Sequence, residues 1–346
     1  MKILITGTEG YIGARAAPIL AARGHAVTGL DTGFYRDGCL YLDPVGLPMA
    51  PHTIFKDLRT VTPADFEGFD AVVHLAELSN DPLGANRPEI TFKINHEGSV
   101  RIAKAAKQAG VKRFVYASSC SVYGLGSGED FLDETAPTNP QTAYANCKVN
   151  VERDVSALAD GDFCVSFLRN ATAYGPSPRM RFDIVLNDLC ALAWTRKKIA
   201  MISDGSPWRP IVHIEDIVEA MRCTLEAPVA AVNGQVFNVG ATSENYRVRE
   251  IAAIVAKAFP GCEVTVGPPS ADNRSYRVNF DKISTKLPGF STRWTAQRGA
   301  EELRKLFERI EFSTQTFEYR AFTRLKQLKY LQHSGQIDQD LYWSVR

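Results

Sequence analysis

Short apolar runs alternate with longer helical stretches through the first half of the chain, and this alternation restricts the fold more than any other feature. The runs are brief and nearly continuously apolar, as in strands buried on both faces. Strand–helix alternation predicts an α/β fold with a doubly wound parallel sheet of the Rossmann type. The expected strands are Lys2–Gly7, Ala26–Asp31, Thr53–Asp57, Ala71–Ala76, Val111–Ser119 and Cys164–Asn170, and the expected helices are Tyr11–Arg23, Pro88–Ala109 and Thr142–Ala159.

The pattern changes after about residue 175, where prolines at 176, 178, 207 and 210 interrupt it. We expect a nucleotide-binding domain over residues 1–175, to which segments within 211–240 return. Residues 176–346 are expected to form mainly a smaller substrate-binding lid with a C-terminal helical extension. The later helices expected in this part are Arg181–Thr195, Arg247–Phe259 and Thr295–Arg309.

Composition excludes several classes of protein. The 346 residues are 45% apolar and 23% charged with a net charge of +1, which is typical of a globular protein and lacks the basic excess of a nucleic-acid binder. No uncharged apolar stretch is long enough for a membrane span. The seven cysteines form no CxxC pair and the histidines no HxH or HExxH pattern, which indicates reduced thiols, a cytoplasmic location and no metal site.

Three glycines follow the first expected strand and open the first helix. Gly7 permits the tight turn, Gly10 lets the backbone approach a diphosphate, and Gly13 lets the helix pack on the strand. Asp31 ends the second strand, where a carboxylate accepts hydrogen bonds from ribose hydroxyls and repels a 2′-phosphate, so NAD is favoured over NADP. Arg36 lies nearby and weakens that preference. Asp57 ends the third strand and suits the adenine edge.

Tyr144 and Lys148 lie four residues apart and therefore share one face of an expected helix. A tyrosine acts as a base near neutrality when a neighbouring cation stabilises its phenolate. Ser119 ends a strand 25 residues before Tyr144, so its hydroxyl is expected to bind the same substrate oxygen.

The chain resembles the extended short-chain dehydrogenases/reductases, particularly the NAD-dependent nucleotide-sugar epimerases and dehydratases. The resemblance runs in order over roughly residues 1–290. It rests on Gly7-x-x-Gly10-x-x-Gly13, His74-Leu75-Ala76, Asn95, Ser118-Ser119-Cys120-Ser121-Val122-Tyr123-Gly124, Pro140-x-x-x-Tyr144-x-x-x-Lys148, Tyr174-Gly175-Pro176 and Arg209-Pro210-Ile211-Val212-His213-Ile214-Glu215-Asp216.

The resemblance implies roles for individual residues. Tyr144 is the expected base, Lys148 binds the nicotinamide ribose, and Ser119 positions the reacting hydroxyl, while Arg209 and Arg274 grip the substrate diphosphate. The expected cofactor-binding residues are Gly7, Gly10, Tyr11, Ile12, Gly13, Asp31, Asp57, Leu58, Leu75, Ala76, Asn95 and Lys148. The expected substrate-binding residues are Ser119, Cys120, Ser121, Tyr144, Asn170, Thr172, Arg209 and Arg274.

Departures from the family pattern narrow the reaction. Dehydratases of this family carry an Asp-Glu pair where this chain has Cys120 and Ser121, and decarboxylases usually carry Glu at the second position. Small uncharged residues here resemble the 4-epimerases. Thr172 replaces a common substrate-binding Asn, and Pro210 replaces an Asp, so the substrate pocket is expected to differ from familiar ones.

We therefore expect an epimerase of a nucleoside-diphosphate sugar that acts at carbon 4 through a transient 4-keto intermediate, with NAD held tightly. Three alternatives stay open: a reductase or oxidase that exchanges its cofactor, 3,5-epimerase chemistry through Cys120, which otherwise packs as a small apolar residue, and a nucleotide-sensing protein without catalysis. A homodimer through the helices at 88–109 and 142–159 is implied by resemblance. The basic segment Tyr319–Tyr330 is expected to be a helix over the lid, or else a contact to an anionic ligand or partner subunit.

Overall fold

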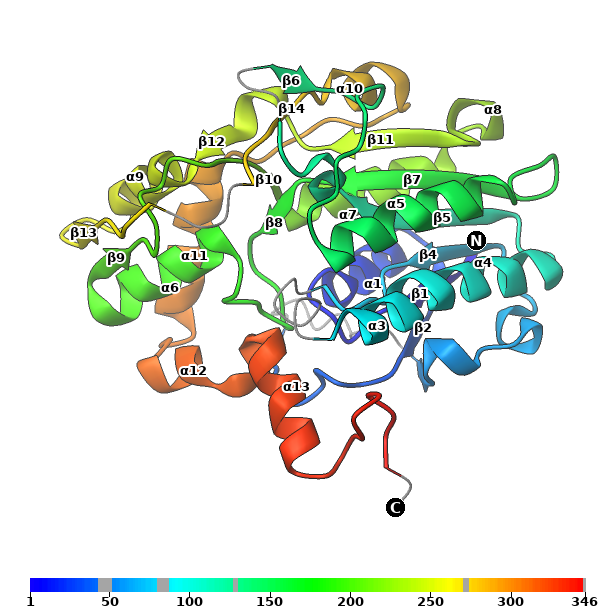
Figure 1. Cartoon of the computed structure of the whole chain (residues 1–346), viewed down its shortest axis with the longest axis horizontal. Helices are drawn as coiled ribbons and strands as arrows, with labels where there is room; N and C mark the ends of the chain where they lie inside the picture. The colour runs from blue at the N-terminus through cyan, green and yellow to red at the C-terminus, as the bar shows by residue number, and fades with distance from the viewer. Residues whose placement is uncertain (43–51, 80–86, 127–129, 270–273, 345–346) are drawn as a thin grey trace.

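Seven parallel strands form the central sheet of the computed structural model, which describes residues 1–42, 52–79, 87–126, 130–269 and 274–344 (Figure 1). The order is β11-β7-β5-β4-β1-β2-β3, so the chain reverses direction across the sheet between β1 and β4, the position where doubly wound sheets bind ligands. This confirms the expected fold. The strands are β1 (Lys2–Thr6), β2 (Ala26–Asp31), β3 (Thr53–Phe55), β4 (Ala71–His74), β5 (Arg113–Ser119), β7 (Cys164–Asn170) and β11 (Gln235–Val239).

Helices cover both faces of this sheet because successive strand residues point to opposite sides. Ile3 packs in a cluster with α1 (Gly13–Ala22) and α7 (Ile214–Glu226), whereas Leu4 packs in another with α4 (Ser99–Gln108) and α5 (Ala143–Ser156). The expected helix Pro88–Ala109 is divided into α3 (Pro88–Thr91), a π-helical stretch η3 (Phe92–Gly98) and α4.

The second half of the chain builds a separate group of elements beside the carboxyl ends of the strands (Figure 1). A three-stranded sheet pairs β8 (Thr172–Tyr174), β10 (Trp208–His213) and β12 (Asn245–Arg247), and a third apolar cluster joins α6 (Val185–Arg196), α9 (Val248–Ala258) and α11 (Ala296–Arg309). The remaining elements are η1 (Leu58–Thr60), η2 (Pro63–Phe66), η4 (Cys120–Tyr123), β6 (Phe131–Leu132), β9 (Lys198–Ala200), α8 (Val229–Val232), η5 (Thr242–Glu244), β13 (Glu263–Thr265), β14 (Arg277–Val278), α10 (Asp281–Lys286), α12 (Thr314–Glu318) and η6 (Arg320–Phe322).

The C-terminal helix α13 (Arg324–His333) lies elsewhere than expected. Phe322, just before it, packs against Phe182 of the lid, but Leu328 packs in the same cluster as Phe34 of the nucleotide half. The expectation of a helix laid over the lid is therefore wrong, because the apolar face of α13 is buried against the loop that follows β2. No helix in the described part of the chain is long and apolar enough to cross a membrane.

Candidate active site

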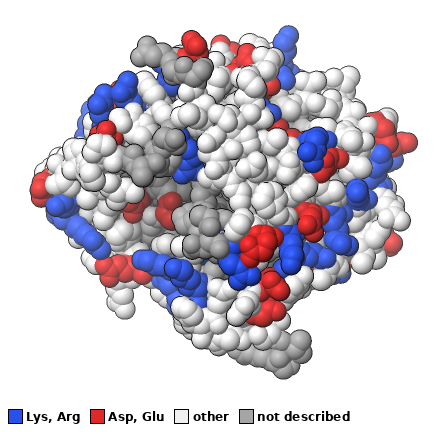
Figure 2. All heavy atoms as spheres, in the orientation of Figure 1, with Lys and Arg blue, Asp and Glu red and all other residues white. Residues whose placement is uncertain are grey.

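A cleft of about 780 Å³ lies at the carboxyl edge of the sheet and is closed on its other side by lid residues. Basic and acidic side chains are interspersed over the face drawn in Figure 2. The cleft brings together most of the expected site residues. Those that line it are Gly7, Gly10, Tyr11, Ile12, Gly13, Asp31, Asp57, Leu58, Leu75, Ala76, Ser119, Ser121, Tyr144, Lys148, Asn170, Thr172, Arg209 and Arg274.

The glycine turn fits a dinucleotide diphosphate. Gly7 has a φ of 83°, and a Cβ at this position would lie 2.9 Å from the backbone nitrogen of Ala76. A Cβ at Gly13 would lie 2.0 Å from the Gly7 carbonyl oxygen, so only glycine lets α1 start this close to β1. The start of α1 therefore lies at the cleft, where the positive end of the helix dipole favours an anion.

Asp31 is held in place to meet a ribose. Its two carboxylate oxygens accept hydrogen bonds from the backbone N–H groups of Glu9 at 2.9 Å and Gly33 at 2.7 Å. Burial raises its pKa to about 6, partly offset by these two hydrogen bonds. Arg36 does not line the cleft, and its guanidinium lies 5.6 Å from the centroid of the Trp343 ring. Arg36, which was expected to weaken the preference for NAD over NADP, therefore lies outside the cleft lining.

Asp57 lines the cleft, but Arg59 engages its carboxylate, with 2.5 Å between Nη2 and Oδ2. Asn95 does not line the cleft. It is fully buried and exchanges two hydrogen bonds with the backbone of Leu78, at 2.8 Å and 2.9 Å. The structure thus does not bring Asn95 into the cleft lining; Asn95 fixes the position of Leu78, which does line the cleft.

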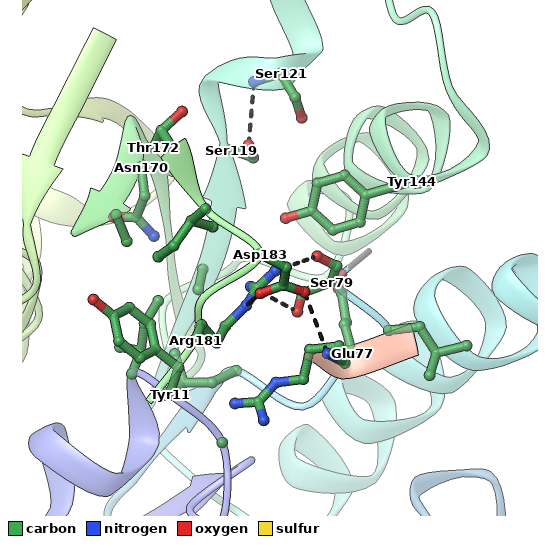
Figure 3. Close-up of a pocket in the computed structure, with 18 of the residues that line it drawn as sticks. Tyr11, Glu77, Ser79, Ser119, Ser121, Tyr144, Asn170, Thr172, Arg181 and Asp183 are labelled. Carbon is green, nitrogen blue, oxygen red and sulfur yellow. Dashed lines mark hydrogen bonds and ion pairs between the residues drawn. The ribbon is translucent and has the colours of Figure 1, made fainter. Parts of the chain in front are cut away.

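Tyr144 and Lys148 lie one turn apart on α5 and both line the cleft. Figure 3 shows the Tyr144 ring projecting from this helix. The Lys148 ammonium lies 5.3 Å from the centroid of the Tyr144 ring and donates to the carbonyl oxygen of Ala117 at 2.5 Å. Ser119, at the end of β5, accepts a hydrogen bond from the backbone N–H of Ser121 at 3.1 Å. This bond does not use the Ser119 hydroxyl proton. In Figure 3, Ser119 and Tyr144 lie above Tyr11.

Glu77 is a site residue that the sequence analysis missed. Its carboxylate lines the cleft, lies 2.8 Å from the Lys148 ammonium, and accepts hydrogen bonds from the hydroxyls of Tyr116 at 2.5 Å and Ser99 at 3.2 Å. Burial lowers the pKa of Lys148, but the Glu77 carboxylate and the Tyr144 phenol together outweigh burial, so this pKa is raised above its ordinary value. The signal was available, because Glu77 directly follows His74-Leu75-Ala76 at the carboxyl end of β4.

Cys120 points away from the cleft and does not line it. Its side chain is 1% exposed, belongs to the apolar cluster behind β5, and donates to the Arg169 carbonyl oxygen at 3.1 Å. Burial raises the pKa of its thiol far above the ordinary value. The structure thus does not bring Cys120 together with the other expected substrate-binding residues, whereas its neighbours Ser119 and Ser121 line the cleft. Its surroundings fit the packing interpretation.

Polar atoms without partners mark the substrate end of the cleft. Within the described residues, the buried Asn170 Oδ1 and Ser121 Oγ have no hydrogen-bond partner, which fits a ligand rich in hydroxyl groups. Thr172 also lines this end. Arg209 and Arg274 lie together there, since the Arg209 guanidinium donates to the backbone oxygen of Arg274.

A second pair missed from the sequence crosses the cleft below Tyr144 (Figure 3). Arg181 forms an ion pair with Asp183 at 2.8 Å, and its guanidinium donates to the Ser79 hydroxyl at 3.1 Å. The expected helix Arg181–Thr195 begins only at Val185, which leaves these two side chains in the cleft lining.

Both histidines of the family motifs are structural. His74 bonds Ser99 at 2.7 Å, and burial, aided by Lys148, lowers its pKa to about 3, so its imidazole stays neutral. His213 caps α7 through the backbone N–H of Glu215 and pairs with Glu302 at 2.9 Å. Among the described residues, no three His, Cys, Asp or Glu side chains converge as metal ligands do.

Known proteins resemble this chain along most of its length. Residues 3–240 match the model of the NAD dependent epimerase/dehydratase family. A UDP-glucose 4-epimerase of Mycolicibacterium smegmatis is 31% identical over 75% of this chain and 82% of its own length. A UDP-N-acetyl-alpha-D-glucosaminuronate decarboxylase of Bacillus cytotoxicus is 26% identical over 83% of this chain and 88% of its own length.

The fold agrees with these matches. The structure of MoeE5 in complex with UDP-glucuronic acid and NAD superposes with a TM-score of 0.77 at 26% identity, covering 89% of this chain and 99% of that one. A Rossmann sheet, a glycine cradle, a ribose-facing carboxylate and a Tyr–Lys pair in one cleft agree with this likeness. The chain belongs to the NAD-dependent epimerase/dehydratase family, and NAD is its cofactor.

Proposed function

We propose that the protein is an epimerase of a nucleoside-diphosphate sugar that inverts carbon 4. The observation that carries this proposal is the arrangement of Ser119, Tyr144 and Lys148 along one wall of the cleft, with no carboxylate at positions 120 and 121. A UDP-glucose 4-epimerase is among its relatives, and solved structures titled with UDP-glucose and UDP-glucuronic acid share its fold. A nucleotide sugar is therefore the substrate class we propose.

The protein's own groups handle the proton. Tyr144 takes the proton of the substrate hydroxyl, and Ser119 holds the same oxygen by a hydrogen bond. Lys148 binds the nicotinamide ribose and keeps the Tyr144 phenol oriented. The chemistry that NAD supplies when bound is reversible hydride acceptance. Asn170, Ser121 and Thr172 are positioned to bind the sugar while it presents either face.

The other reactions of the family need an acidic or basic side chain that is free to exchange a proton with the sugar. Elimination of water or loss of carbon dioxide needs an acid or base beside the sugar in addition to the tyrosine. Position 120 holds a buried thiol directed out of the cleft, and position 121 a serine. Two carboxylates labelled in Figure 3, Glu77 and Asp183, form ion pairs with Lys148 and Arg181.

The test is analysis of products. Purified protein is incubated in heavy water with UDP- and dTDP-linked hexoses, hexosamines and hexuronic acids, and the mixture is followed by mass spectrometry and proton NMR. We expect an isomer of unchanged mass, inverted at carbon 4 and without solvent deuterium. Loss of water, loss of carbon dioxide, or stoichiometric consumption of NAD would each contradict the proposal and identify a dehydratase, a decarboxylase or a cofactor-exchanging oxidoreductase.

We also propose that the protein is a homodimer, since α4 and α5 lie side by side on one face of the sheet, as the expected paired interface requires (Figure 1). Sedimentation equilibrium tests this directly, and a monomer at micromolar concentration would contradict it. A cytoplasmic location is proposed from the scattered cysteines, which are all unpaired.

A further inference from the structure

The C-terminal segment, defined here as residues 320–343, lies against the nucleotide half of the site. Gln327 donates to the Phe34 carbonyl oxygen at 3.0 Å, and the Trp343 indole donates to the Thr32 carbonyl oxygen at 2.6 Å. Both acceptors belong to the loop after β2, directly behind Asp31. Figure 1 shows α13, in red, beside this blue loop. The segment is thus fixed at the end of the cleft where the adenosine half of the cofactor belongs.

Arg324, the first residue of α13, projects from this segment into the cleft lining. The residue is 3% exposed, and its guanidinium lies 4.0 Å from the centroid of the Tyr35 ring. Its hydrogen-bond acceptors are the carbonyl oxygens of Arg179 at 3.3 Å and Ala321 at 3.5 Å. Both contacts are at or beyond the long end of the usual range, so most of its hydrogen-bonding capacity is unused.

Three other cations of the cleft lining form ion pairs with carboxylates. Lys148 pairs with Glu77 at 2.8 Å, Arg181 with Asp183 at 2.8 Å, and Lys56 with Asp65 at 2.7 Å. Within the described residues Arg324 has no ion pair. Burial, with the charge of Arg181 beside it, lowers its pKa to about 10.

The Asp183 and Asp31 carboxylates act on this charge, but neither forms an ion pair with it. A buried guanidinium compensated only in this way is unfavourable, and an anion bound beside it would stabilise it. The cofactor would bring such an anion into this cleft, because the glycine turn that suits its diphosphate lines the cleft together with Asp31 and Tyr144. The planar fork of arginine matches two phosphate oxygens at once.

We propose that Arg324 is a cofactor-binding residue that grips the diphosphate of NAD from the side opposite the glycine turn. The C-terminal segment then completes the cofactor site, although it lies outside residues 3–240 that match the family. This assignment is independent of which sugar is bound and which carbon is inverted.

The test measures binding to cofactor-free protein by calorimetry at fixed ionic strength, with NAD, ADP and adenosine as probes. We expect Arg324→Gln to weaken NAD and ADP roughly 10- to 100-fold and to leave adenosine within about twofold. Arg324→Lys should recover part of the loss, because it restores the charge without the fork. Lys326→Gln is the matched control, since Lys326 is an exposed cation on the same helix. This variant should bind all three probes as wild type does.

Thermal unfolding of the same cofactor-free variants separates binding from structure. Arg324→Gln should unfold at the wild-type temperature or above it, because it removes a buried charge that has no ion-pair partner among the described residues. Unchanged affinity for NAD and ADP would overturn the proposal. An equal loss for all three probes with a lower unfolding temperature would overturn it as well, since that pattern indicates a structural arginine.

Discussion

The Glu77 carboxylate lies 2.8 Å from the Lys148 ammonium, with both side chains almost fully buried. In the simplest account of this family's chemistry, the lysine charge stabilises the phenolate of the neighbouring tyrosine. Here a carboxylate held by Tyr116 and Ser99 offsets much of that charge. Paired with Glu77, Lys148 therefore stabilises the Tyr144 phenolate less than an unpaired lysine would. Glu77 also holds Lys148 in a fixed position.

Replacing Glu77 by Gln should lower the pH at which Tyr144 loses its proton by about one unit, because it removes a negative charge from the vicinity of the phenol. Carbon-13 NMR of ring-labelled tyrosine, with the Tyr144 signal assigned through Tyr144→Phe, measures this without substrate. Glu97→Gln, which changes an exposed carboxylate on η3, is the control and should leave the titration unmoved. An identical titration in Glu77→Gln and wild type would show that the pair does not set the acidity of Tyr144.

Tyr144→Phe should reduce turnover by about three orders of magnitude or more, the scale of a lost general base. NAD binding should change less than about twofold, since the ring remains and only the hydroxyl is removed. Turnover is followed by the NMR assay on the substrate found by product analysis, and NAD content by absorbance after denaturation. Activity close to wild type would exclude Tyr144 as the base.

The affinity for NAD should fall as the pH drops through about 6. Folding raises the pKa of Asp31 from 3.8 to about 6, so its carboxylate is lost below that value, and the ribose hydroxyls then lose an acceptor. In the cofactor-free protein the same shift gives a stability contribution that is present below the unfolded pKa and is lost as the pH rises through about 6. Calorimetric titrations of wild type and Asp31→Asn across this window test the first statement; an equally steep pH dependence in Asp31→Asn would assign it to another group.

Cys120→Ser should leave turnover within a few-fold of wild type, and the product formed in heavy water should still carry no solvent deuterium. The serine hydroxyl can still donate to the Arg169 carbonyl oxygen, although the apolar cluster loses the sulfur. The expected cost in the free energy of unfolding is about 1 kcal/mol, measured by urea denaturation. A variant that folds normally but has lost turnover would restore Cys120 as a catalytic group.

Gly13→Ala should destabilise the protein by several kcal/mol, or prevent folding, because the new Cβ would meet the Gly7 carbonyl oxygen at 2.0 Å. Gly24→Ala offers a contrast, since the glycine there has a positive φ but open space around it. It should cost about 1 kcal/mol from backbone strain alone. Similar denaturation midpoints for the two variants would contradict the close packing of α1 on β1.

The sequence alone predicts those features that depend on neighbouring residues. Strand and helix periodicity place β1, β2, β4, β5 and β7, because a strand buried on both faces needs an unbroken apolar run. The glycine turn is predictable because the close backbone contacts that require glycine fall within seven consecutive residues. Tyr144 and Lys148 share a helix face by spacing alone. Asn95 and Cys120 do not reach the cleft lining, because irregular helical stretches that no spacing rule describes direct their side chains: η3 for Asn95 and η4 for Cys120.

The tertiary structure alone decided the charge balance of the site and its closure. Glu77 meets Lys148 across 71 positions of sequence, and Arg324 enters a cleft whose glycine turn lies more than 300 residues earlier. Periodicity and local spacing report on contacts within one turn or one strand, whereas ion pairing in a cleft depends on which elements the packed core brings together. The sequence therefore determined the fold and the reacting pair, and only the packing of distant segments determined which charges surround them.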